Sequence, residues 1–156
     1  MKKLFLTTYN KQSLDLGILL IRIAVAAMML AHGIPKMITL FAGGAVQFPS
    51  VFGMSPELSL GLAVFAEVGC SVLILAGLGT RFAAVPLAIT MMVAAFSIHA
   101  ADPFAMKELA LHYLVAYTVL FFTGSGKYSL DHLLQKKIVG VYSRQGHGEP
   151  AFQRNK

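Results

Sequence analysis

The sequence has little charge, one cysteine and no tryptophan. Charged residues make up 13% of the 156 positions, about half of the share found in soluble domains. The single cysteine, Cys70, excludes an internal disulfide, and neither a CxxC nor a CxxCH motif occurs. A glycine-rich nucleotide-binding loop and internal repeats are missing as well. These absences exclude disulfide scaffolds, dithiol redox motifs, c-type haem attachment and P-loop enzymes.

Hydrophobic residues are abundant and make up 56% of the chain. They form four apolar segments, residues 14–34, 60–78, 82–100 and 104–123, and the first is expected to end at Pro35. Each approaches the roughly 20 residues with which a helix crosses a bilayer. We therefore expect an all-α fold, an integral-membrane antiparallel four-helix bundle in contact with the lipid bilayer. The bundle is one domain over residues 14–134, and residues 135–156 are expected to form a basic, flexible cytoplasmic tail.

The distribution of lysine and arginine predicts the orientation of this bundle. With four crossings, ten basic residues lie at the end that holds both termini, and two, Lys36 and Lys107, lie at the other. Cytoplasmic ends are enriched in lysine and arginine, so we expect both termini in the cytoplasm. The basic residues do not form a face with aromatic residues between them, which excludes a nucleic-acid partner despite the net charge of +6. The first apolar run is too long for a signal peptide and is predicted to be a retained span.

Glu67 is the one carboxylate well inside the second span. Counted at about 1.5 Å per residue, it lies on the order of 10–12 Å from the start of that helix. An ionisable group at this depth costs about 2.5–3.5 kcal/mol on insertion scales, so it normally faces other helices or a wet cavity. The other ionisable residues of the spans are therefore its candidate partners.

Three basic residues, Arg22, His32 and Lys36, fall within an arc of roughly 80° on the first helix. This stripe is expected to face inward. His32 and Lys36 lie in the same outer half of the bundle as Glu67. Arg22 lies in the inner half, where snorkelling to the interface or a structural ion pair is favoured over catalysis.

Further polar residues are expected at the same outer end. His99 lies near the end of the third span, and Asp102 is predicted to cap the fourth helix. Glu108 and His112 are four residues apart and share a helix face. The apolar loop of residues 37–58 is expected to fold over the mouth of the bundle or to dip into the interface. Acids and bases that meet in this way are candidates for proton transfer, with structural salt bridges as the alternative.

Several short motifs, in this order and spacing, resemble the DoxX family. They are Arg22, His32-Gly33-x-x-Lys36, Glu67-x-Gly69, Gly77-x-Gly79-Thr80-Arg81, Glu108 and Gly124-x-Gly126-x-x-Ser129-x-Asp131. The resemblance covers roughly residues 14–134. It implies a four-helix protein of the bacterial inner membrane, related to the DoxD-type membrane subunit of thiosulfate:quinone oxidoreductase. It also implies a link to oxidative stress and thiol redox systems.

Three functional hypotheses follow. The outer polar cavity binds a quinone or a similar redox molecule, or the chain is a non-catalytic membrane subunit that anchors a redox or stress-response enzyme, or it conducts a small solute or protons. A divalent metal or haem is disfavoured because no diagnostic spacing occurs. A redox-enzyme partner and a homo-oligomer fit each hypothesis. The candidate catalytic residues are Glu67, Glu108 and His112, and the candidate substrate-binding residues are Arg22, His32, Lys36 and His99.

Overall fold

The computed structural model describes residues 10–144, and for residues 140–144 it describes the backbone only. The first span is a single helix, α1 (Lys11–Phe41). The second span is continuous through α2 (Pro56–Val64), the π-helix η2 (Phe65–Cys70) and α3 (Ser71–Ala76). The third span joins α4 (Thr80–Val93) to a second π-helix, η3 (Ala94–Ile98), and the fourth is α5 (Phe104–Thr123). A further helix, α6 (Leu130–Arg144), follows the bundle.

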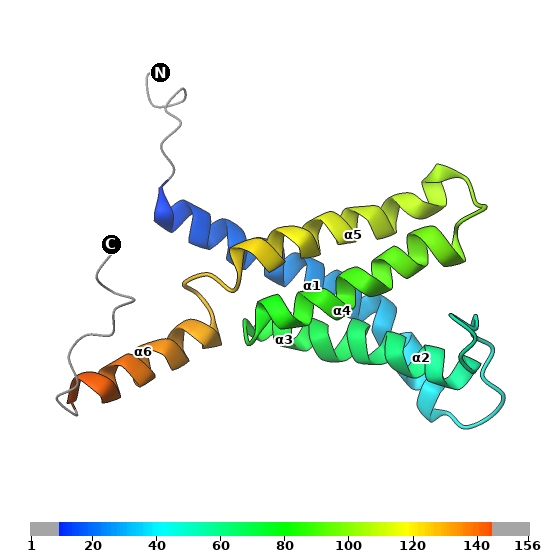
Figure 1. Cartoon of the computed structure of the whole chain (residues 1–156), viewed down its shortest axis with the longest axis horizontal. Helices are drawn as coiled ribbons and strands as arrows, with labels where there is room; N and C mark the ends of the chain where they lie inside the picture. Colours follow the sequence, from blue (N-terminus) through cyan, green and yellow to red (C-terminus); the bar gives the residue numbers. More distant parts are fainter. Residues whose placement is uncertain (1–9, 145–156) are drawn as a thin grey trace, which may run out of the picture.

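Four helices in the described chain are long and apolar enough to cross a membrane. Consecutive spans run in opposite directions, as Figure 1 shows. The start of α1, the α3–α4 turn and the end of α5 lie at one end of the bundle, which we call the α6 end. The connection of residues 42–55 and the η3–α5 connection lie at the other, which we call the loop end. The predicted all-α membrane fold is confirmed.

The first helix does not end at Pro35, as the sequence had led us to expect. It continues to Phe41 with Pro35 inside it. A proline removes one backbone hydrogen bond, and membrane helices tolerate this because side chains and neighbouring helices satisfy the freed groups. One turn beyond the proline, Thr39 Oγ1 donates to the Pro35 carbonyl oxygen at 3.1 Å. The extra turn and a half keeps Lys36 on the helix, where it extends toward the second span.

The buried core runs along the centre of the bundle. Ile74, Leu87, Tyr117 and Leu120 have no exposed surface. Large apolar side chains also cover the outside, such as Phe82 and Phe122. An apolar exterior around a packed interior is what a bundle surrounded by lipid requires.

Arg22 is the largest fully buried side chain, and it lies near the α6 end of the bundle. Its guanidinium donates to the carbonyl oxygens of Ile74 (2.9 Å) and Leu75 (2.9 Å) at the end of α3. It also donates to those of Ser125 (2.7 Å) and Tyr128 (2.9 Å) in the α5–α6 connection. The predicted placement in the half of the bundle opposite to Glu67 and Lys36 is correct, but the side chain neither snorkels nor forms a direct ion pair in the described chain. It links backbone carbonyls at the end of α3 to carbonyls in the α5–α6 connection.

Two side chains, Ser129 and Asp131, organise the segment after α5. Ser129 caps α6 as predicted, accepting from the His132 N–H at 3.2 Å. Asp131 accepts from the Gly79 N–H with both carboxylate oxygens at 3.0 Å, which fixes α6 to the α3–α4 turn. The helix continues to Arg144, so residues 135–144 are helical where we had expected the tail to begin. Residues 145–156 of that predicted tail lie outside the described residues.

Candidate functional site

An ion pair between α1 and η2 lies at the centre of the site. Lys36 Nζ donates to Glu67 Oε1 at 2.5 Å, and Glu67 is 2% exposed. The other carboxylate oxygen, Oε2, is buried and has no hydrogen-bond partner among residues 10–144. Leaving a buried acceptor unpaired is unfavourable, so this oxygen is suited to bind a ligand group or a water molecule.

The backbone around the pair is built for close approach. A Cβ atom at Gly33 would lie 2.9 Å from Glu67 Cβ and 2.8 Å from Val68 Cγ2. Only glycine therefore allows α1 to lie this close to η2 without displacement. Glu67 itself is part of a π-helical turn, and such turns occur frequently at functional sites.

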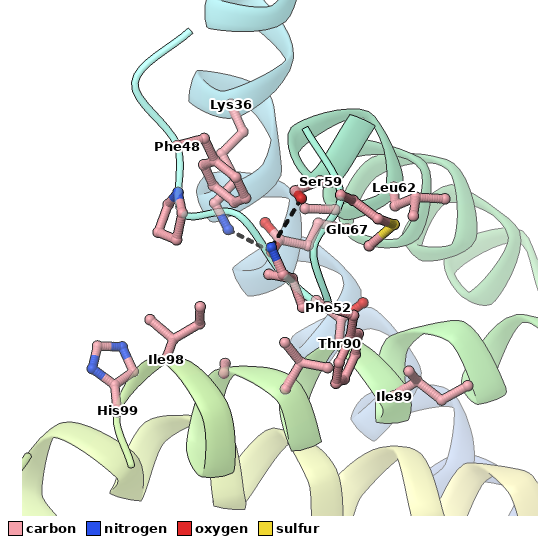
Figure 2. Close-up of a pocket in the computed structure, with 16 residues that line it drawn as sticks. Lys36, Phe48, Phe52, Ser59, Leu62, Glu67, Ile89, Thr90, Ile98 and His99 are labelled. Atoms are coloured by element: carbon pink, nitrogen blue, oxygen red, sulfur yellow. Dashed lines mark hydrogen bonds and ion pairs between the residues drawn. The ribbon is translucent and has the colours of Figure 1, made fainter. Parts of the chain in front are cut away.

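A cavity of about 420 Å³ opens beside Glu67. Its size falls within the roughly 300–1,000 Å³ of small-molecule sites. Apolar side chains from the second and third spans and from the connection of residues 42–55 form most of its wall. Figure 2 shows Lys36 and Glu67 on one side of it and Ile98 and His99 across from them. The polar residues of the lining are Lys36, Ser59, Glu67, Thr90 and His99.

The connection of residues 42–55 covers this cavity, which confirms that the apolar loop folds over the bundle mouth. The Val51 N–H donates to Ser59 Oγ at 3.2 Å, which attaches the loop to α2. Lys36 Nζ lies 5.9 Å from the centre of the Phe48 ring, a cation–π distance. Lys36 thus contacts both the carboxylate and the loop. The loop residues that line the cavity, which we call the lid residues, are Phe48, Pro49, Val51, Phe52 and Met54.

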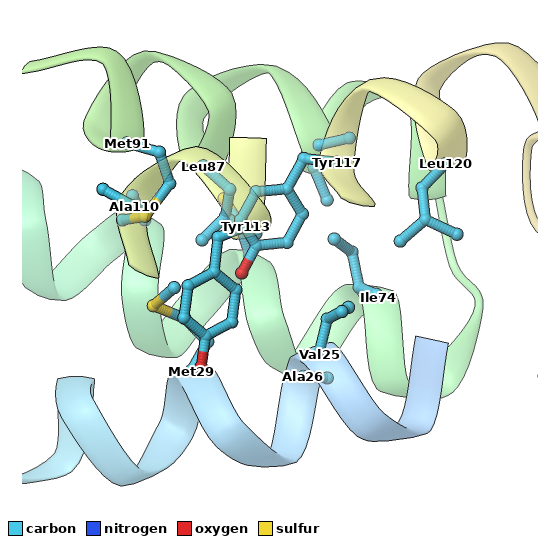
Figure 3. Close-up of a cluster of buried hydrophobic side chains, with 14 of the residues drawn as sticks. Val25, Ala26, Met29, Ile74, Leu87, Met91, Ala110, Tyr113, Tyr117 and Leu120 are labelled. Carbon is cyan, nitrogen blue, oxygen red and sulfur yellow. The ribbon is translucent and has the colours of Figure 1, made fainter. Parts of the chain in front are cut away.

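A second cavity of about 170 Å³ adjoins the first. Both are lined by Lys36, Glu67, Ala94 and His99. The smaller cavity also reaches His32 and Tyr113, whose rings meet edge to face with centroids 6.2 Å apart. Tyr113 in turn stacks on Tyr117 at 6.0 Å, and Figure 3 shows both rings in the bundle interior.

His99 and Asp102 pair with each other near the mouth of both cavities. His99 Nδ1 lies 2.7 Å from Asp102 Oδ2. The prediction that Asp102 caps the fourth helix is wrong. Helix α5 begins at Phe104 with Pro103 in the cap position, so Asp102 lies one residue too early to cap and contacts His99 instead.

Glu108 and His112 share a face of α5 as predicted, but that face is exposed. His112 Nδ1 is 2.8 Å from the Glu108 carbonyl oxygen, and neither residue lines the two cavities. The expectation that they converge on Glu67 is wrong. The buried stripe of α5 runs through Ala110, Tyr113, Tyr117 and Leu120, which turns Glu108 and His112 outward. Arg22, the fourth predicted binding residue, is engaged by carbonyls away from the site.

Of the predicted site residues, the structure therefore brings together His32, Lys36, Glu67 and His99. Sequence reasoning missed the tyrosines, the lid residues and Ser59. The tyrosines carried a weak signal, because two hydroxyls spaced four apart in an apolar span share a face. In the described chain, no three His, Cys, Asp or Glu side chains lie close enough to hold a metal ion together.

A bundle of four membrane-spanning helices, with a half-buried lysine paired to a buried glutamate beside a ligand-sized cavity, defines a small multi-pass membrane protein. The chain belongs to the DoxX family, whose family model matches residues 17–100. Thus the family suggested by the motifs is confirmed. The part matched includes the ion pair and most residues of both cavities.

Three relatives illustrate the similarity. The chain is 33% identical over 129 residues to inner membrane protein YqjF of Escherichia coli K12, covering 79% of this chain and 95% of that protein. It is 30% identical over 129 residues to a Bacillus subtilis protein named "Putative oxidoreductase CatD", covering 80% and 92%. It is 35% identical over 95 residues to an uncharacterized Haemophilus influenzae protein, covering 58% of this chain and less than two thirds (63%) of that protein. No solved structure matches the chain.

Proposed function

We propose that the larger cavity binds a quinone-like molecule and that the chain is a redox-associated component of the bacterial inner membrane. The observation that carries the proposal is the Lys36–Glu67 pair in the wall of a mostly apolar, membrane-embedded cavity. A quinone ring has the matching chemistry, because it is flat and apolar with carbonyl oxygens at its edge.

The pair offers the two polar contacts that such a ring uses. An ammonium group has three donors, and Lys36 uses one of them on Glu67. Another is free to donate to a quinone oxygen and to stabilise negative charge that develops there on reduction. Glu67 Oε2 accepts the hydroxyl proton of the reduced form. The aromatic lid residues Phe48 and Phe52 pack against the ring.

The names of two relatives support a redox-associated role in the inner membrane. The Escherichia coli relative is named an inner membrane protein, and the Bacillus subtilis relative carries the word oxidoreductase in its name. The basic residues at the α6 end favour a cytoplasmic location for both termini. The cavity then opens on the opposite side of the membrane. Electrons reach it from a redox-enzyme partner or a soluble donor.

The test is equilibrium binding of decylubiquinone to the purified protein in detergent, measured by isothermal titration. Lys36→Gln and Glu67→Gln remove one charge each and are expected to weaken binding about tenfold or more, the equivalent of about 1.5–3 kcal/mol for a hydrogen bond to a charged group. In the double variant, Lys36→Gln with Glu67→Gln, the two neutral side chains can still hydrogen-bond to each other. Because this variant retains the packing of the pair, it distinguishes a loss of folding from a loss of binding.

Two matched controls lie near the same end of the bundle. Lys107→Gln changes a lysine whose Nζ donates to the Ala100 carbonyl oxygen at 2.7 Å. Glu57→Gln changes an exposed carboxylate in the first turn of α2. Neither residue lines the cavities, so both variants should bind like the wild type. Absence of binding to the wild type, or equal effects of the site and control variants, would contradict the proposal.

A further inference from the structure

Two buried oxygen atoms of residues that line the smaller cavity have no partner in the described chain. They are Glu67 Oε2 and Tyr113 Oη. Their residues are at most 4% exposed. Buried polar side chains nearly always have a hydrogen-bond partner, which can be an ordered water. Unpaired atoms gathered in one place therefore indicate bound water.

The smaller cavity has the volume and the polar groups that water requires. Its volume is about 170 Å³, whereas a water molecule occupies about 30 Å³ in the liquid and needs two to four polar partners. The polar residues of the lining supply them: His32, Lys36, Glu67, His99 and Tyr113. Its outer edge is formed by residues with exposed surface, among them His32. Water can thus enter from the loop end.

We propose that the smaller cavity is a water-filled vestibule through which water, and protons with it, reaches Glu67, while the larger cavity takes the ligand. The assignment of the larger cavity rests on the proposed function, but the hydration of the vestibule does not. Glu67 is part of the wall of both cavities. It therefore contacts the vestibule and the ligand cavity at the same time.

The titratable groups near Glu67 come from three elements of the bundle. Helix α1 supplies Lys36 and His32, the end of η3 supplies His99, and α5 supplies Tyr113 and Tyr117. A proton enters as part of a water molecule at Glu67 Oε2. The new O–H bond forms there as the O–H bond of the water breaks, and the next water restores the lost proton. No electron moves in this step.

The lining allows each cavity to be filled separately. Ala110 lines only the smaller cavity, and Ala63 lines only the larger one. Ala110→Leu should displace water from the vestibule, and Ala63→Leu should reduce the ligand cavity. The two variants carry the same chemical change, so each serves as the control for the other.

The experiment is X-ray radiolytic labelling of the full chain in detergent and ¹⁸O water, read by mass spectrometry. Hydroxyl radicals formed from bound water modify the side chains next to it. In the wild type, Tyr113 and Met29 should be labelled several-fold faster than Tyr117, which is also buried but lines neither cavity. Ala110→Leu should lower the labelling of Tyr113 and Met29 to the level of Tyr117, whereas Ala63→Leu should leave it unchanged.

Labelling of Tyr113 as slow as that of Tyr117 in the wild type would overturn the proposal, as would equal reduction by both variants. If Ala110→Leu is not recovered in folded form, Ala110→Val adds a smaller side chain at the same place and the same criteria apply. If the wild type shows the expected labelling pattern but does not bind quinone, the proposed function is contradicted and the hydrated vestibule is not.

Discussion

Replacing Arg22 should disrupt the α6 end of the bundle and leave the cavities in place. Arg22→Met keeps much of the aliphatic volume but removes four hydrogen bonds of 2.7–2.9 Å to buried or half-buried carbonyl oxygens. Each acceptor left unpaired costs about 1–3 kcal/mol. Because the four act together and some become hydrated, we expect a total loss of about 3–5 kcal/mol, as for other broken buried charge contacts.

Arg81 provides the matched control for this change. It lies at the same end, is exposed, and donates once, from Nη2 to the Phe122 carbonyl oxygen at 3.2 Å. Arg81→Met should cost less than about 1 kcal/mol. Arg22→Lys should recover little, since one ammonium cannot reach carbonyls on both sides of the planar guanidinium. The measurement is the melting temperature in detergent, with decylubiquinone binding below that temperature. Equal stability of the two methionine variants, or lost binding by a folded Arg22→Met protein, would refute this reasoning.

Three further changes test separate parts of the structure. Gly33→Ala should displace α1 from the second span and weaken quinone binding, at a cost of about 1–3 kcal/mol for overpacking, whereas Gly17→Ala, with nothing within 4 Å of the added carbon, should be neutral or stabilising in thermal melts. Ser129→Ala should lower the stability by about 0.5–2 kcal/mol through loss of the cap without changing ligand binding, and unchanged melting would contradict the capping role. In a cysteine-free background, Ser50→Cys should react with an impermeant thiol reagent on intact cells and Gln135→Cys only after lysis. The reverse pattern would overturn the orientation.

The sequence was sufficient for the spans but not for their details. Long apolar runs identify membrane helices because the bilayer fixes their length. Pro35 was misjudged as an end, since the rule that proline stops helices weakens where neighbouring helices satisfy the freed backbone groups. The π-turns of η2 and η3 had no visible signal in the sequence.

The depth of the site residues along their helices was predictable from the sequence, but the direction in which their side chains face was not. Counting residues along each helix placed Lys36 and Glu67 at the same end, and they pair. The same counting placed Glu108 and His112 at that end too, yet they face outward. In an exterior that is as apolar as the interior, hydrophobicity does not reveal which face packs. Tyr113 and Tyr117 were overlooked for the same reason, because in an apolar span they pass as core aromatics.

The two buried charges of the bundle differ in how completely they are satisfied, and this difference separates structure from chemistry. Arg22 uses four hydrogen bonds to backbone carbonyls that do not change protonation, so it is a fixed connection between helix ends. Glu67 has one partner and one unpaired oxygen, between two cavities. A fully satisfied charge gains nothing from a ligand, whereas an incompletely satisfied one stabilises whatever completes it. We therefore propose binding and proton exchange at the loop end, around Glu67, and a purely structural role for the α6 end.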